Sequence, residues 1–197
     1  CAVRISGIVV APPWDIPDHQ SGSTLIVIQP SMGFGTGHHA STRVCLRALQ
    51  ALSLTNRSVL DIGTGSGVLA IAAAKLGSPT VTGIESDLDA LDTALGNITL
   101  NKVSHLVRLS HDDIRKADKL DSASVVVANI SAALVCEHAE EILRTVEANG
   151  SLVVGGFTES EESRVRQALE PHGVLTSRHM EDEWLALTFS MKSARKD

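Results

Sequence analysis

From Val59 onward, short apolar segments alternate with helix-like segments, and this alternation restricts the possible folds more than any other feature. The strand-like segments cover residues 59–62, 81–86, 106–110, 124–130 and 150–157. Alternation of this kind is typical of parallel strands with helices on both faces of a sheet. Residues 174–191 break the pattern, because they indicate two strands with a turn near 180–183. We therefore predict an α/β fold with a Rossmann-like, doubly wound, mostly parallel sheet of about seven strands and an antiparallel C-terminal hairpin.

The first 58 residues are less regular. Residues 4–10 and 24–29 each predict one short strand, and a Pro-rich connector separates them. A helix over about 41–52 follows, with Ser41 as its N-cap. Further along, residues 133–147 predict a single helix. We expect one compact domain, in which residues 1–40 supply N-terminal strands and a glycine loop and residues 41–197 form the Rossmann-like part.

Composition excludes some classes of function. Aromatic residues make up only 3% of the 197 residues and the net charge is −6, so neither a nucleic-acid surface nor an anionic membrane surface is indicated. No apolar run is long enough to span a bilayer. The three cysteines, Cys1, Cys45 and Cys136, lack metal-ligand spacing. We expect buried thiols, a cytoplasmic location and no metal site.

The segment from Asp61 to Gly67, DIGTGSG, predicts a cofactor-binding turn after a strand. Glycines at positions 63, 65 and 67 permit a tight turn and close approach of a ligand to the backbone. The spacing is G-x-G-x-G, whereas the dinucleotide fingerprint is G-x-G-x-x-G. Asp61, two positions before Gly63, suits a cationic ligand better than a pyrophosphate. S-adenosylmethionine, with an ammonium and a sulfonium group, fits Asp61, Gly63, Gly65 and Gly67 as binding residues.

Acidic residues follow the next two strands. Glu85 ends the strand after the glycine turn, where a carboxylate can accept both ribose hydroxyls of a nucleoside cofactor. Asp112 and Asp113 follow the third strand, and we favour Asp112 as the acceptor for the adenine amine. In the alternative interpretation, this pair only caps a helix.

A single amide ends the strongly apolar strand at residues 124–130. Asn129 is placed to orient an incoming amine through its side-chain carbonyl, and we predict it as the residue that aligns the substrate. Alternatively, Asn129 caps the following helix, although Ser131 can also serve as that cap.

Four segments together resemble the PrmA family: GFGTGHHAST at 33–42, VLDIGTGSGVLAIAAAKLG at 59–77, VVVANI at 125–130 and EDEW at 181–184. The resemblance extends from residue 12 to the tail. It implies a class I methyltransferase fold and transfer of methyl from S-adenosylmethionine, leaving S-adenosylhomocysteine, to lysine or other amino groups of a protein of the large ribosomal subunit. It also implies that the first glycine loop covers the cofactor, with Thr36, Gly37 and Thr42 as contacts. Gly63, Glu85 and Asn129 match other cofactor contacts of the family.

The chain departs from the family pattern in several places. His38 and Ala40 replace a small hydroxyl residue and a proline, and Glu85 stands where Asp is more frequent. We expect the family's N-terminal substrate domain to be absent, which leaves the acceptor open. A small-molecule amine methyltransferase and a catalytically idle adenosylmethionine-binding domain therefore remain alternatives. Asp61 and the glycine spacing argue against a nucleotide-dependent oxidoreductase.

Three further interpretations concern individual side chains. Thr42 has an alternative role as an ordinary residue of the first helical turn. Trp14 and Trp184 are expected to be packing residues, with a place at the substrate mouth as the alternative for Trp184. His38 and His39 are expected at the surface, and no general base is assigned.

Overall fold

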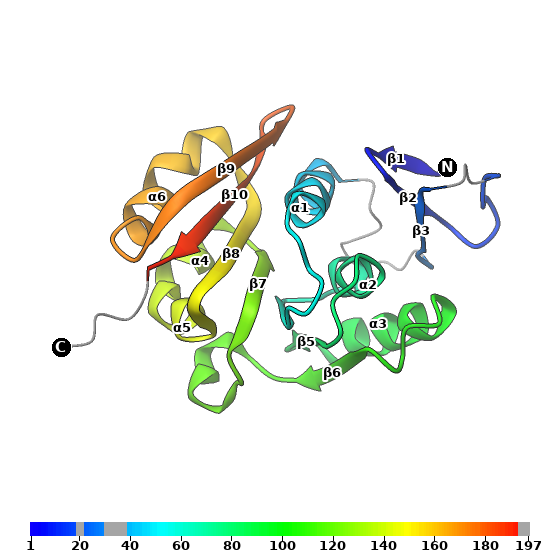
Figure 1. Cartoon of the computed structure of the whole chain (residues 1–197), viewed down its shortest axis with the longest axis horizontal. Helices are drawn as coiled ribbons and strands as arrows, with labels where there is room; N and C mark the ends of the chain where they lie inside the picture. Colours follow the sequence, from blue (N-terminus) through cyan, green and yellow to red (C-terminus); the bar gives the residue numbers. More distant parts are fainter. Residues whose placement is uncertain (19–21, 30–38, 193–197) are drawn as a thin grey trace.

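The computed structural model describes residues 1–18, 22–29 and 39–192. Its main sheet has the strand order β6-β5-β4-β7-β8-β10-β9, and β10 alone runs opposite to the other six strands (Figure 1). The predicted seven-stranded, mostly parallel sheet with an antiparallel C-terminal hairpin is thus confirmed. The strands are β4 (Val59–Ile62), β5 (Val81–Glu85), β6 (Val107–His111), β7 (Ala123–Asn129), β8 (Val146–Thr158), β9 (Gly173–Glu181) and β10 (Trp184–Met191).

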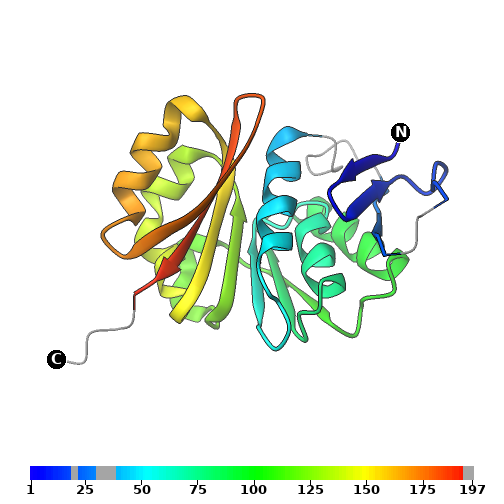
Figure 2. The same cartoon turned by 45° about the horizontal axis from the view of Figure 1, so that its top comes forward.

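Helices cover both faces of this sheet, as Figures 1 and 2 show. Alternate residues of each strand enter two separate cores: Val59 and Val125 pack with the helices on one face, and Leu60 and Val126 pack with those on the other. This explains why the central strands are mostly apolar on both faces, with Asp61 in β4 as a buried exception. The first face carries α1 (Ala40–Ala51), α2 (Val68–Lys75) and α3 (Leu88–Leu100), and the second carries α4 (Ala132–Glu137), α5 (Ala139–Arg144) and α6 (Glu162–Leu169).

The N-terminal residues form a separate three-stranded sheet beside α2 and α3 (Figures 1 and 2). It comprises β1 (Val3–Ile5), β2 (Ile8–Ala11) and β3 (Thr24–Val27). The prediction of a single strand over 4–10 is wrong, because the chain reverses between Ile5 and Ile8 into an antiparallel pair. Ser6 takes a left-handed conformation there, with φ of 49°. β3 then pairs with β2 in parallel.

Two helix predictions need correction. The N-cap of α1 is His39 and not Ser41, because the Nδ1 atom of His39 accepts from the Ser41 amide at 3.3 Å. The single helix expected over 133–147 is two helices, because His138 leaves the helical conformation with φ of −113° and ψ of 28°. Two short 3-10 segments, η1 (Ile114–Lys119) and η2 (Glu159–Glu161), complete the elements.

Several side chains that were expected to be buried are exposed or half-buried. Trp14 is 68% exposed, so its predicted packing role is wrong. It lies in a turn after Pro12 and Pro13, outside the strands of either sheet. Of the three free cysteines only Cys45 is buried, since Cys1 is exposed and Cys136 is half-buried. None of the helices in the described ranges is both long and apolar enough to cross a membrane.

Candidate functional site

The glycine turn between β4 and α2 requires glycine at each of its three positions. Gly63, Gly65 and Gly67 have φ angles of 68°, 53° and 82°, a region that other residues enter only with strain. A Cβ atom on Gly63 would lie 3.1 Å from the Cγ2 atom of Ile130. The turn therefore leaves bare backbone at the carboxyl end of β4.

Asp61 lies behind this turn and is only 1% exposed. Its Oδ2 atom accepts from the Thr64 hydroxyl at 2.6 Å and from the Ala70 amide at 3.1 Å. Its Oδ1 atom is buried without a hydrogen-bond partner among the described residues. Burial raises the pKa of Asp61 to about 6, and the nearby Glu85 carboxylate adds to this rise. Asp61 thus holds the turn to α2 from the inside.

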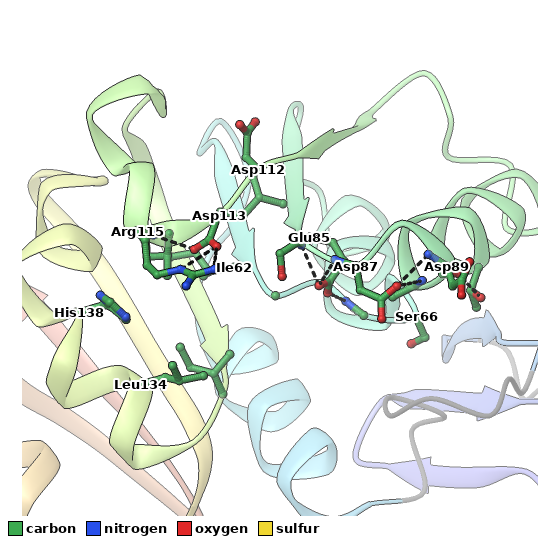
Figure 3. Close-up of a pocket in the computed structure, with 18 of the residues that line it drawn as sticks. Ile62, Ser66, Glu85, Asp87, Asp89, Asp112, Asp113, Arg115, Leu134 and His138 are labelled. Atoms are coloured by element: carbon green, nitrogen blue, oxygen red, sulfur yellow. Dashed lines mark hydrogen bonds and ion pairs between the residues drawn. The ribbon is translucent and has the colours of Figure 1, made fainter.

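A pocket of about 940 Å³ opens in front of the turn, at the carboxyl ends of the parallel strands (Figure 3). Of the predicted site residues, Gly63, Gly65, Glu85 and Asp112 line it. This edge of a doubly wound sheet is where such folds bind ligands. The structure therefore brings residues from β4, β5 and β6 together around one cavity.

Glu85 is fixed by the backbone around it. Its Oε2 atom accepts from the Gly65 amide at 3.0 Å, and its Oε1 atom accepts from the Ser86 and Asp87 amides at 2.9 Å and 3.1 Å. A carboxylate has about four acceptor positions, so it retains capacity for a further donor. Glu85 thereby connects the glycine turn to the start of α3.

The charged lining of the pocket is mostly acidic. Among the described residues that line the pocket, Arg115 is the one arginine, and it is hydrogen-bonded to Asp113 and holds the pKa of that carboxyl at about 2. Figure 3 shows this pair on the wall opposite Glu85. Such a lining favours a cationic ligand and disfavours a phosphate. The carboxylates are those of Glu85, Asp87, Asp89, Asp112, Asp113 and Glu137.

The two aspartates after β6 have different roles. Asp113 caps η1, because its Oδ1 atom accepts from the Arg115 amide at 2.9 Å. Asp112 accepts instead from the Ser110 hydroxyl, and Figure 3 shows its carboxylate pointing away from Glu85. The capping interpretation therefore holds for Asp113 alone.

Asn129 ends β7 next to the first turn of α1. Its Nδ2 atom donates to the Thr42 hydroxyl at 3.5 Å, and its Oδ1 atom is buried without a partner among the described residues. The N-cap of α4 is Ser131, whose hydroxyl accepts from the Leu134 amide, so the alternative role of Asn129 as a cap is wrong. Thr42 is only 2% exposed and stands in the first helical turn, as its alternative interpretation requires. Its hydroxyl also contacts Asn129.

The remaining predicted residues lie around this arrangement. Gly67 is the N-cap of α2, and a Cβ atom on it would lie 3.4 Å from the Cβ atom of Ala94 in α3. His39 is exposed, as expected, and half-buried Trp184 packs against its ring edge-on at a centroid distance of 4.5 Å. Thr36 and Gly37 of the first glycine loop, and His38 beside them, lie outside the described residues.

Sequence reasoning missed several residues of the site. In the glycine motif, Thr64 occupies a position where any residue is allowed, yet its hydroxyl donates a hydrogen bond to the Asp61 carboxylate. Arg115 lines the pocket from η1 and His138 lines it from the junction of α4 and α5, and no motif indicates either. Within the ranges that the structure describes, no three His, Cys, Asp or Glu side chains are grouped to hold a metal ion.

Comparison with known proteins gives consistent results. The family model described as ribosomal protein L11 methyltransferase (PrmA) matches residues 2–192. A relative of that name from Listeria monocytogenes serotype 4a is 32% identical over 181 residues, which are 91% of this chain and 58% of the relative. Another from Geotalea daltonii is 34% identical over 203 residues, covering 96% of this chain and 64% of the relative. The chain thus spans less than two thirds of the length of these relatives.

A solved structure agrees over almost the whole chain. The ribosomal protein L11 methylase from Lactobacillus delbrueckii subsp. bulgaricus is 25% identical, and the match covers 97% of this chain and 98% of that one, with a TM-score of 0.87. The strand order of the main sheet, together with the solved methyltransferase structures that this chain resembles, identifies the fold as that of class I methyltransferases. Since the family model covers nearly every residue, the chain belongs to the ribosomal protein L11 methyltransferase (PrmA) family.

Proposed function

We propose that this chain binds S-adenosylmethionine and transfers its methyl group to an amine, most directly an amino group of a ribosomal protein. The observation that carries the proposal is the acidic pocket around a left-handed glycine turn at the carboxyl ends of the parallel strands. Family membership supports it, because the relatives are named for methylation of ribosomal protein L11. A ribosomal acceptor in turn implies a cytoplasmic location.

The pocket fits this cofactor in charge and in shape. S-adenosylmethionine carries positive charge and no phosphate, which suits a lining dominated by carboxylates. Glu85 is the proposed acceptor for the ribose hydroxyls and has capacity for one further donor beyond its three backbone amides, and Asp112 is the proposed acceptor for the adenine amine. Gly63, Gly65 and Gly67 would leave the backbone open to the amino-acid end.

Other proposed contacts rest on the family pattern together with local geometry. Thr42 and Asn129 touch each other beside the sheet edge. Thr36 and Gly37 are proposed from the family pattern alone. Asp61 acts from behind the turn, where it holds Thr64 and the start of α2 in place.

When bound, S-adenosylmethionine supplies a methyl group already activated by its positively charged sulfur. The protein's contribution is therefore mainly orientation. The acceptor amine must be neutral to attack, and a lysine ammonium, with a pKa of about 10.4, must first lose a proton. The buried Oδ1 atom of Asn129 lacks a donor among the described residues and is suited to accept from the amine N–H. Asn129 would thus align the nitrogen with the methyl group.

A methyl-transfer assay tests this proposal. Labelled S-adenosylmethionine is incubated with the chain and either purified ribosomal protein L11 or a panel of small primary amines. The proposal expects label on the protein acceptor, which mass spectrometry then assigns to amino groups. Label on small amines alone would support the alternative of a small-molecule methyltransferase. Binding of cofactor with no transfer to any acceptor would indicate an idle binding domain.

A further inference from the structure

Two buried asparagines of α3 hold the N-terminal sheet in place. Asn101, 7% exposed, donates to the Val27 carbonyl at 2.6 Å and accepts from the Val27 amide at 2.9 Å. Asn97, fully buried, accepts from the Gln29 amide at 2.8 Å. β3 pairs with β2 along one edge, so these side-chain amides replace a neighbouring strand along the other. The N-terminal sheet therefore docks partly through polar groups at the end of α3, together with Lys75 of α2, whose ammonium donates to the Leu25 carbonyl at 2.6 Å.

Asn97 has a second partner that Asn101 lacks. Its Nδ2 atom donates to the Ser66 carbonyl at 2.9 Å, inside the glycine turn. Ser66 and the preceding Gly65 both line the pocket. One helical turn before Asn97, Ala94 packs against Gly67, so α3 touches the turn at two adjacent points. A single buried amide thus joins the ligand-facing turn to residue 29.

We propose that Asn97 is a positioning residue that couples binding at the glycine turn to docking of β3. This inference rests on the proposed function, because the ligand of the turn is the proposed cofactor. Both hydrogen bonds depend on one side-chain orientation, so a movement of the Asn97 amide that breaks one bond also strains the other, and each buried group left unpaired costs about 1–3 kcal/mol. A ligand that restrains the Ser66 carbonyl therefore also favours the hydrogen bond to the Gln29 amide. The coupling is reciprocal: docked β3 strengthens ligand binding at the turn.

A matched pair of variants separates coupling from simple docking. Asn97→Ala removes the bond to Ser66 and the bond to Gln29 just after β3. Asn101→Ala removes two bonds to Val27 of β3 and one to the Asn97 carbonyl, and no bond to the turn. Titration calorimetry with S-adenosylhomocysteine is expected to show a Kd about tenfold higher for Asn97→Ala. For Asn101→Ala we expect less than about a threefold change, although this variant loses more of the docking contact.

Hydrogen exchange provides a second test, first in the unmodified chain and then in both variants. Saturating S-adenosylhomocysteine is expected to slow amide exchange at Val27 and Gln29. In Asn97→Ala this slowing should disappear, and in Asn101→Ala the slowing at Gln29 should remain.

Three results would overturn the coupling: unchanged exchange at Gln29 on ligand addition, unchanged affinity in Asn97→Ala, or equal losses of affinity in both variants. If the unmodified chain does not bind S-adenosylhomocysteine at all, the proposed function itself fails, and this inference fails with it.

Discussion

At the scale of single residues, the site depends on side chains whose hydrogen bonding is incomplete. Asp61 and Asn129 each bury one oxygen that no described residue satisfies. Buried polar groups in folded proteins are nearly always paired, so such exceptions tend to have a functional reason. Here one exception lies behind the glycine turn and the other at the end of β7.

Asp61 gives a prediction about pH and stability. Its pKa in the folded state, about 6, lies above the ordinary value of 3.8, so folding favours the neutral carboxyl. This contribution is complete below about pH 4 and is lost as pH rises through about 6. Asp61→Asn stays neutral throughout, so we expect its Tm to rise relative to the unmodified chain between pH 4 and pH 8. Parallel Tm profiles for the two proteins would contradict the assignment.

Asn129 gives a prediction about kinetics. If its free oxygen aligns the acceptor amine, Asn129→Ala should lower kcat by about tenfold or more, because orientation of the attacking group is lost. The affinity for S-adenosylhomocysteine should change by less than about threefold. Calorimetry and initial rates with the acceptor that the unmodified chain methylates provide the measurement. A loss confined to cofactor affinity would remove the proposed role.

Residue identities were easier to predict than their partners. The positions of Glu85 and Asn129 at strand ends follow from where the apolar runs stop. The bond from Thr64 to Asp61 does not, because it depends on the left-handed path of the turn between them. The expected burial of Trp14 failed for a related reason, since hydrophobicity alone does not say whether any element lies opposite a side chain.

At the scale of elements, the unit from β4 through the glycine turn to α2 is the part most closely determined by sequence. Each glycine occupies a conformation that side chains disfavour, and α2 begins directly at Gly67. The helix itself is almost entirely buried and apolar, so its position is set by packing. The turn and the helix therefore behave as one rigid support for the pocket.

A pair of alanine substitutions tests this support. Gly67→Ala forces a side chain into a left-handed conformation with φ of 82° and should destabilise the fold by about 1–2 kcal/mol. Gly96 lies in the exposed part of α3 with open space around its Cα atom, so Gly96→Ala should stabilise by about 0.5–1 kcal/mol. Urea unfolding measures both. Shifts of the same sign in the two variants would show that the backbone conformation at Gly67 is not the controlling factor.

The predicted boundaries of strands and helices were wrong where the sequence carries no strong turn or helix-ending residue. The two strands at residues 3–11 look like one continuous strand in the sequence, because only Ser6 and Gly7 separate them at the point where the chain reverses direction. The break between α4 and α5 at His138 carries no glycine or proline. The ends of α4 and α5 are set by their packing, since both contact β8 and α5 also contacts η1. These contacts between distant segments cannot be inferred from a single sequence.

At the scale of the whole molecule, two cores and an added N-terminal sheet surround one acidic pocket. The main sheet divides the apolar residues between its two faces, and the carboxyl ends of its strands supply the glycine turn, Glu85, Asp112 and Asn129. The mostly parallel sheet with helices on both faces was predictable from the alternation of strands and helices. The docking of β3 on α3 was not, because it depends on buried asparagines, a residue type that more often indicates a surface.

The central claim is that this pocket binds S-adenosylmethionine, and titration calorimetry with S-adenosylhomocysteine tests it most directly. We expect micromolar binding to the unmodified chain, and a Glu85→Ala variant weaker by about 1–3 kcal/mol, because ribose donors lose their acceptor. Glu170→Ala, an exposed carboxylate in an ion pair with Arg166 and not among the residues of the pocket, serves as the matched control and should bind normally. Under the same conditions NAD should not bind. Absence of binding by S-adenosylhomocysteine, or tighter binding by NAD, would contradict the account.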